Sequence, residues 1–519
     1  MRGRRVVGRA ALGACLLATV LREAPAGAGA NRCGTEPPDR SPTWVDGAGS
    51  HWLDAEGLWT QAPADGMFGG GGVSFERRDV QADPWSNHSL QAYVSAERQC
   101  VAIGPRDIGG NGEGAYPIEP APAIPDVPWL ARDGQLFRAD DGRSTILRGV
   151  DWPYDQEIFE APYELTDADF ERIASWGMNL LRVRIAGYRS GYVPGTVAEP
   201  GYWEHLDQLI AKANAHGIYV LPSTVTADAE SMNVGTGHDQ LKFIEGTSNH
   251  AWWMDYQRAV FERYRDWPGV VGFDTLNEDN SYPPYVHDRF FVGELHRDAV
   301  RMLRDEVGDH RHVYFQEPAG WSYWGAEWWT GMMQGHDIGD DNRFFCTKYK
   351  PGGNGDEEMT VKGALAVESN APFFICEWWV DNADPATVLA WQRDAQDAMD
   401  ERLIGGARVL YGPSAGYGTH TRDGVESYWI DEFARPYPIW AGGDITGVDY
   451  DYDTSTLVAS FDLDGSGPTE VFTSAARTYP DGFVATASNG AALTWDAATE
   501  RVILPPTSGP VTITIAPAS

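Results

Sequence analysis

Long apolar segments and cysteines are both scarce in this sequence of 519 residues. The apolar run near the N-terminus, residues 10–21, is too short to span a bilayer, so we expect no stable membrane insertion. The five cysteines show no spacing typical of a metal site, and we expect neither a metal nor an organic cofactor. No internal repeat or low-complexity tract stands out, so nothing points to a repeat architecture.

Basic residues are also few. The chain has 40 Lys and Arg against 75 Asp and Glu, a formal net charge of −35. A surface of this sign repels nucleic acid and anionic lipid headgroups, which excludes nucleic acid as a partner. It keeps the chain soluble, and we expect a monomer.

The N-terminus has the pattern of a secretory signal peptide. Several arginines precede residues 10–21, and small residues at 26–30 form a cleavage zone. We therefore expect residues 1–30 to be removed and the protein to be secreted or extracellular. A lipid anchor on Cys15 is the alternative, but the apolar run continues past Cys15 and hardly exists before it.

Export makes the remaining cysteines interpretable. Cys33, Cys100, Cys346 and Cys376 are an even number in an oxidising compartment. We expect Cys33 and Cys100 to form a disulfide that pins the N-terminal segment. Cys346 and Cys376 fall in consecutive predicted strands, where a second bridge and two buried thiols are both possible.

After residues 1–30, the chain divides into four parts by composition. A Gly-, Asp- and Trp-rich segment at 31–112 predicts a small module of unknown role, and the Pro-rich residues 113–128 predict an extended linker. Residues 129–434 alternate buried-strand and amphipathic-helix patterns, which predicts a (β/α)8 TIM barrel. Residues 435–519 predict a C-terminal β-sandwich. The predicted barrel strands are 145–150, 179–185, 218–222, 270–276, 313–316, 344–349, 373–377 and 407–411, and the predicted helices are 166–176, 202–216, 251–266, 289–306 and 385–403.

Two of these buried-strand patterns end on a glutamate. The run 270–276 stops at Asn277 and Glu278, and the run 373–376 stops at Glu377. Barrel enzymes place their chemistry at the carboxyl ends of the strands. Glycoside cleavage needs two carboxyl groups there, an acid for the leaving oxygen and a base or nucleophile for the anomeric carbon. The alternative is that both acids merely cap the following helices.

The order of motifs resembles glycoside hydrolase family 5, in its endoglycoceramidase and glycosylceramidase-like branch. Leu147-Arg148-Gly149-Val150-Asp151 is similar to the family's first strand, and Gly177-Met178-Asn179-Leu180-Leu181-Arg182 to its second. Asn277-Glu278 matches the acid/base motif, and Ile375-Cys376-Glu377 the nucleophile strand. Phe433-Ala434-Arg435-Pro436-Tyr437-Pro438 resembles the junction to the β-sandwich in this branch.

The resemblance assigns roles. Glu377 would be the nucleophile of a retaining mechanism, Glu278 the general acid and base, and Asn277 the group that binds the 2-hydroxyl. Arg182 and Tyr349 would keep Glu377 ionised. Arg184 competes with Arg182 for this role, and Glu317, at the end of the fifth strand, competes with Glu278.

The chain also departs from the family pattern. Residues 221–224 lack the strand-three histidine, and Thr347 stands where the family has a second one. The eighth strand lacks the tryptophan that floors the sugar site, and we expect Trp378, with Trp379 and Tyr411 as alternatives, to supply this platform. These losses put the geometry of the subsites in doubt more than the mechanism.

The sequence therefore predicts a secreted retaining β-glycosidase that acts on a carbohydrate or glycolipid, with a glycosylceramide-like glycolipid as the leading substrate. The alternatives are a β-glucanase or mannanase acting on polysaccharide, and a non-catalytic glycan-binding protein on a hydrolase scaffold.

Overall fold

The structure is a computed structural model of the whole chain. For the N-terminal segment it describes the backbone of six strands only, so the signal peptide, the lipid-anchor alternative at Cys15 and the Cys33–Cys100 bridge lie outside the described residues. Side chains are described for most of the chain from residue 122 onward. The described ranges are 122–153, 165–185, 187, 190–192, 201–225, 248–277, 286–317, 338–349, 359–360, 371–380, 384–413, 418–421 and 423–518, with side-chain burial left undescribed at a few positions near the ends of these ranges.

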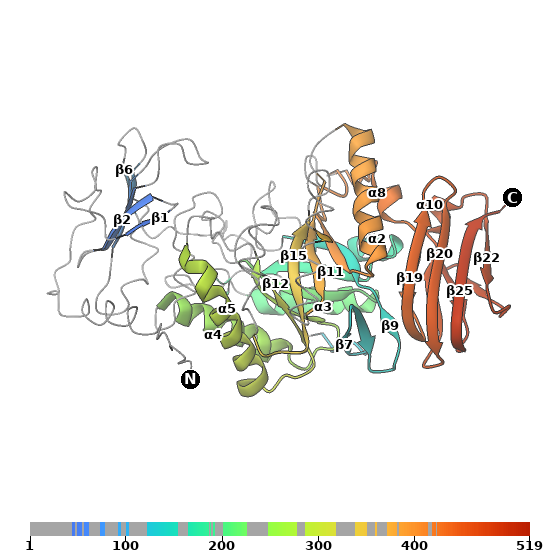
Figure 1. Cartoon of the computed structure of the whole chain (residues 1–519), viewed down its shortest axis with the longest axis horizontal. Helices are drawn as coiled ribbons and strands as arrows, with labels where there is room; N and C mark the ends of the chain where they lie inside the picture. The colour runs from blue at the N-terminus through green and yellow to red at the C-terminus, as the bar shows by residue number, and fades with distance from the viewer. Residues whose placement is uncertain are drawn as a thin grey trace, which may run out of the picture.

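A closed barrel of parallel strands forms the centre of the molecule (Figure 1). The strands follow one another in chain order, and β10 pairs with β17 to close the barrel. This confirms the predicted TIM barrel. The barrel strands are β10 (Arg148–Trp152), β11 (Leu180–Ile185), β12 (Tyr219–Val225), β13 (Gly272–Asn277), β14 (Val313–Gln316), β15 (Arg343–Tyr349), β16 (Phe373–Trp378) and β17 (Gly406–Val409).

Amphipathic helices surround the barrel and bury one face against it. Helix α2 begins where the side chains of Thr166 and Asp169 form a capping box, and α8 begins after Asp384, which accepts a bond from the Thr387 backbone N–H. The helices are α2 (Asp167–Ser175), α3 (Tyr202–Ala215), α4 (Ser248–Tyr264), α5 (Val286–Arg301), which continues as a π-helical turn over Met302–Glu306, and α8 (Pro385–Glu401), followed by the short α9 (Ile430–Phe433).

A small antiparallel sheet closes the amino-terminal end of the barrel. It consists of β7 (Leu130–Asp133), β8 (Leu136–Ala139) and β9 (Ser144–Thr145). Phe137 of β8 stacks on Phe344 with ring centroids 4.9 Å apart, within the cluster that fills the barrel interior. Because Ser144 and Thr145 belong to this sheet, the first barrel strand begins at Arg148, three residues later than predicted.

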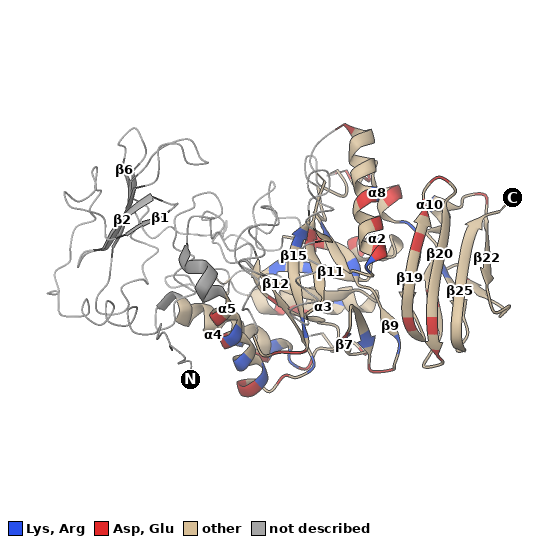
Figure 2. Ribbon diagram, in the orientation of Figure 1, with Lys and Arg blue, Asp and Glu red and all other residues tan. Residues whose placement is uncertain are grey.

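Two antiparallel sheets follow the barrel and enclose a second apolar core, as predicted for a sandwich. Figure 2 shows acidic residues on β19 and β20, where outward-facing positions of the alternating pattern carry aspartates. The first sheet is β18 (Tyr437–Trp440), β21 (Thr469–Phe472), β24 (Arg501–Leu504) and β23 (Thr494–Asp496), and the second is β19 (Gly443–Asp451), β20 (Thr456–Asp464), β25 (Ser508–Pro517) and β22 (Phe483–Ala487).

Buried ionic contacts join the barrel to these sheets. Asp400 of α8 pairs with Arg148 of β10 and, at 2.5 Å, with Arg435 just before β18. The Tyr437 hydroxyl donates to the Gly177 carbonyl at 2.5 Å. The chain therefore enters the C-terminal sheets from a segment already fixed to the barrel.

The N-terminal segment contains an antiparallel sheet in the order β1 to β6. Its strands are β1 (Trp44–Asp46), β2 (Gly49–Leu53), β3 (Gly57–Gln61), β4 (Val73–Arg77), β5 (Ala92–Val94) and β6 (Cys100–Ala102). Among the helices that the structure describes, none is both long and apolar enough to cross a membrane.

Candidate active site

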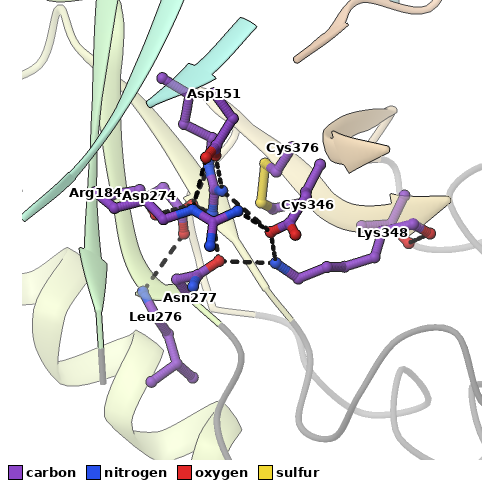
Figure 3. Close-up of polar contacts among 12 residues, drawn as sticks. Asp151, Arg184, Asp274, Leu276, Asn277, Cys346, Lys348 and Cys376 are labelled. Atoms are coloured by element: carbon purple, nitrogen blue, oxygen red, sulfur yellow. Dashed lines mark hydrogen bonds and ion pairs between the residues drawn. A yellow bond between two sulfur atoms is a disulfide. The ribbon is translucent and has the colours of Figure 1, made fainter. Parts of the chain in front are cut away.

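Alternation along the barrel strands brings a cluster of charged side chains into one end of the barrel. In β11, Leu180 belongs to the interior cluster, whereas Leu181 and Val183 face the helices. Arg182 and Arg184 therefore share the interior face with Leu180, further toward the carboxyl end of the strand. The fully buried Arg182 is the hub of the cluster. Figure 3 labels other members of the cluster, among them Asp151, Arg184, Asp274, Asn277 and Lys348.

Two aspartates fix the position of Arg182. Its Nη1 contacts Asp151 Oδ2 of β10 at 2.5 Å, and its Nη2 contacts Asp274 Oδ2 of β13 at 2.7 Å. Ser223, in the carboxyl-terminal half of β12, donates to the same Asp274 oxygen at 2.7 Å. A hydroxyl thus orients this carboxylate where the strand-three histidine of the family pattern is missing.

Glu377 of β16 is contacted by three cations. Arg184 Nη2 lies 2.9 Å and Arg182 Nη1 lies 3.4 Å from its Oε2, and Lys348 Nζ contacts the same oxygen. Burial raises the pKa of Glu377, but Arg184, Lys348 and Arg182 together outweigh it and lower that pKa to about 2. Glu377 is therefore an anion at any ordinary pH.

Asn277 connects the carboxylate to the end of β13. Its Oδ1 accepts from Arg182 Nη2 at 2.7 Å and from Lys348 Nζ at 2.8 Å. Only the carbonyl oxygen of an amide can accept from two cations, so these bonds fix which way the Asn277 side chain is turned. Glu278, the next residue, lies outside the described residues.

An extra residue in β16 places the side chain of Glu377 in the charged cluster. Lys348 pairs with Glu377 and Thr347 with Ile375, so Cys376 is an extra residue in the ladder. Cys376 and Glu377 can therefore both face the interior. Cys376 forms a disulfide with Cys346 of β15, which settles the question that the sequence left open.

Charges balance within the described part of the cluster. Three cations, Arg182, Arg184 and Lys348, contact the three carboxylates of Asp151, Asp274 and Glu377. The only described group of potential metal ligands combines Asp274 with Cys346 and Cys376, whose sulfurs are bonded to each other. The sulfurs are used in the disulfide and Asp274 binds Arg182 and Ser223, so this group does not suit a metal ion.

The structure thus brings together Arg182, Asn277 and Glu377, as the sequence predicted. Arg184 is not an alternative to Arg182, because both contact the same carboxylate oxygen. The sequence did not predict the roles of Asp274 and Ser223, and the cation that it missed is Lys348. A lysine between Thr347 and Tyr349 in an otherwise apolar strand was the available signal, since a buried lysine needs a charged partner.

Tyr349 and Trp378 have different surroundings from those we expected. Lys348 faces the interior, so its neighbour Tyr349 faces the layer between barrel and helices, where it is buried. Trp378 is 1% exposed and packs against Phe433 and Arg408 in the same layer. A fully buried ring offers no face to a sugar. The residue of β15 that forms an ion pair with Glu377 is Lys348, the neighbour of Tyr349.

Glu317 lies at the end of β14 and is 1% exposed. Its backbone oxygen accepts from His296 Nε2 at 2.7 Å, and the other ring nitrogen of His296 bonds to the Tyr314 hydroxyl at 2.7 Å. The negative charge of Glu317 acts on Arg182 and contributes to raising the pKa of that guanidinium, although burial acts against this. Glu317 therefore borders the cluster and stays a competitor of Glu278.

Solved structures share this fold. Endo-glycoceramidase II from Rhodococcus sp., in complex with a five-membered iminocyclitol, aligns with a TM-score of 0.60 and 20% identity over 74% of this chain and 99% of that one. An endogalactoceramidase aligns with a TM-score of 0.61 and 18% identity over 75% of this chain and 100% of that one. Sterylglucosidase 1 of Cryptococcus neoformans aligns with a TM-score of 0.58 and 11% identity over 76% of this chain and 99% of that one.

Sequence comparison identifies the family. No curated protein sequence matches the chain significantly. Two family models do. The one described as glycoside hydrolase family 5 C-terminal domain matches residues 435–515, and the one described as cellulase (glycosyl hydrolase family 5) matches residues 140–405, just over half of the chain. The chain is therefore a glycoside hydrolase and belongs to glycoside hydrolase family 5.

Proposed function

We propose that the protein is a secreted, retaining β-glycosidase that cleaves a glycolipid such as a glycosylceramide. The observation that carries the proposal is the state of Glu377. Three cations hold its Oε2, and among the described residues none contacts Oε1. An ionised carboxylate with one anchored oxygen suits a nucleophile, because the other oxygen can attack the anomeric carbon.

The reaction has two steps. Glu377 Oε1 forms a bond to the anomeric carbon while the bond to the leaving oxygen breaks, and Glu278 gives its proton to that oxygen. A water molecule then attacks the same carbon and gives its proton to Glu278, and Glu377 leaves with its electron pair. Asn277, which adjoins Glu278 in the chain, would bind the 2-hydroxyl.

The glycolipid assignment is supported by what the structural relatives are called. Their names are endo-glycoceramidase II, endogalactoceramidase and sterylglucosidase 1, and endo-glycoceramidase II was also solved in a complex with ganglioside GM3. Export is supported by the signal-peptide pattern at residues 1–30 and by the Cys346–Cys376 disulfide, because such bonds persist mainly in oxidising compartments.

The test of the mechanism is a trapping experiment. A 2-deoxy-2-fluoro β-glycoside with a dinitrophenol leaving group should inactivate the enzyme and add one glycosyl unit to the peptide that contains Glu377. A label on another residue, or an inverted product in a proton NMR time course, would reject the proposal. Hydrolysis of a glycolipid panel against β-glucan and mannan then decides the substrate class.

A further inference from the structure

Lys348 is the least expected member of the cluster. It belongs to β15, is fully buried, and lies beside Glu377 in the strand ladder. Its Nζ contacts both Glu377 Oε2 and Asn277 Oδ1, the latter at 2.8 Å. Figure 3 shows the side chain extending toward Asn277. A lysine in this environment is stable only as one half of an ion pair, so it brings a positive charge to the carboxylate.

We infer that Lys348 is a catalytic residue of this glycosidase, which stabilises Glu377 as the leaving carboxylate when the glycosyl-enzyme intermediate is hydrolysed. The inference rests on the proposed function, in which Glu377 is the nucleophile. In the second step the bond between the anomeric carbon and Glu377 Oε1 breaks, and its electron pair returns to the carboxylate. The new negative charge is shared with Oε2, where Lys348 is already in contact.

The same contact has an opposite effect on the first step. A cation that stabilises the free carboxylate makes it a weaker nucleophile, because part of that stabilisation is lost when the ester forms. Lys348 therefore shifts the balance of the two steps, slowing formation of the intermediate and speeding its hydrolysis. A neutral side chain at this position would do the reverse and let the intermediate accumulate.

Other charged groups surround Glu377, and Lys348 acts in addition to them. Arg182 and Arg184 of β11 contact the same oxygen. Their partners Asp151 and Asp274, from β10 and β13, complete the described cluster, with Glu317 of β14 at its border. Removing Lys348 leaves two cations on Glu377, so the pKa of Glu377 should rise without returning fully to its ordinary value.

The experiment compares Lys348→Met and Lys348→Gln with Lys348→Arg, which keeps the charge. Lys212→Met is the matched control, since Lys212 is a half-exposed lysine of α3 that pairs with Asp167. Each variant is assayed with a dinitrophenyl β-glycoside, whose leaving group needs no protonation. Stopped-flow absorbance gives the burst, mass spectrometry measures the glycosyl-enzyme, and steady-state assays give the pH profile of kcat/KM.

We expect both neutral variants to show a burst, to hydrolyse the intermediate about tenfold or more slowly, and to shift the acid limb of kcat/KM upward by about one pH unit. Lys348→Arg and Lys212→Met should resemble the wild type.

If a folded neutral variant keeps the wild-type burst and acid limb, the inference is overturned. If instead Glu377→Ala retains turnover, or the trapped label is elsewhere, the proposed function fails and not only the role of Lys348. Should both neutral variants fail to fold, a wild-type acid limb near the ordinary carboxyl pKa would by itself overturn the inference.

Discussion

The disulfide between Cys346 and Cys376 ties β15 to β16 directly before these strands present Lys348 and Glu377. Cys376 is the extra residue in the ladder, and Glu377 follows it immediately. The covalent bond and the ion pair therefore hold the same two strands at successive positions, one inside the barrel and one at the site.

Removing this disulfide should weaken the fold. The two cysteines are 30 residues apart, and closing a loop of that length contributes about 3–4 kcal/mol in the chain-entropy account. We expect the double variant Cys346→Ala, Cys376→Ala to lose roughly this free energy of unfolding, measured by urea denaturation. Wild-type protein treated with a reductant should lose the same free energy of unfolding. If two free thiols can be titrated while the free energy of unfolding is unchanged, the prediction is wrong.

Arg182 should be more important for folding than a surface arginine. It is fully buried, and Arg182→Met would take a paired cation from Asp274 and leave Asp151 with Arg184, which costs about 3–5 kcal/mol for a buried pair. Arg258→Met is the matched control, because Arg258 pairs with Glu306 at the surface and should contribute less than about 1 kcal/mol. Equal unfolding free energies for the two variants would rule out the hub role of Arg182.

The ion pairs of Glu377 should make stability depend on pH. The pKa of Glu377 is lowered from 4.5 to about 2 in the folded protein, so the unfolded chain takes up the proton first as pH falls. The stabilisation is complete above pH 4.5 and is lost as pH falls toward about 2. Glu377→Gln should therefore be less stable than wild type at pH 6, and this gap in unfolding free energy should narrow by pH 3. A constant gap would contradict the lowered pKa.

Azide should distinguish the role of Glu278 from that of Glu377. Glu278→Ala should still react in the first step with a dinitrophenyl glycoside and then stall, and azide should restore turnover with a β-glycosyl azide as product. Glu377→Ala should lose turnover, and azide should give the α-azide. If Glu317→Ala abolishes activity with ordinary substrates while Glu278→Ala does not, the acid/base role belongs to Glu317.

Trp378 should matter for stability and not for substrate affinity. Its ring is buried against Phe433 and Arg408, and replacing a buried tryptophan by alanine costs about 3–5 kcal/mol. We expect Trp378→Ala to lower the unfolding free energy by that amount, with KM unchanged within about twofold at a temperature where the variant is folded. A large rise in KM for the folded variant would restore the sugar-platform role.

The barrel could be predicted because its strands contain short apolar runs, and a parallel strand is buried on both faces. Asn277 and Glu377 were found because they end such runs, and Arg182 was found because its segment resembles the family's second strand. It could not be predicted that Lys348 and not Tyr349 faces the barrel interior, because this depends on which face of β15 is turned inward. The small sheet with Phe137 was missed as well, since its strands are short and follow a proline-rich segment that predicts no structure.

Local register limited the prediction further. The extra residue at Cys376 allows two consecutive side chains to face the interior, and nothing in the sequence of β16 marks that irregularity. Arg184 and Glu377 meet across the barrel interior, although their strands β11 and β16 are not neighbours. Such contacts follow from three-dimensional closure, which a one-dimensional pattern does not contain.

Asp400 accepts ion pairs from both sides of the boundary between the two family matches, from Arg148 in the barrel and from Arg435 at the start of the C-terminal sheets. Cutting the chain after residue 434 would remove one of these arginines and also Tyr437, whose hydroxyl binds the barrel at Gly177. The C-terminal sheets are therefore not a detachable accessory. They share buried contacts with the barrel, and we expect the two parts to unfold together.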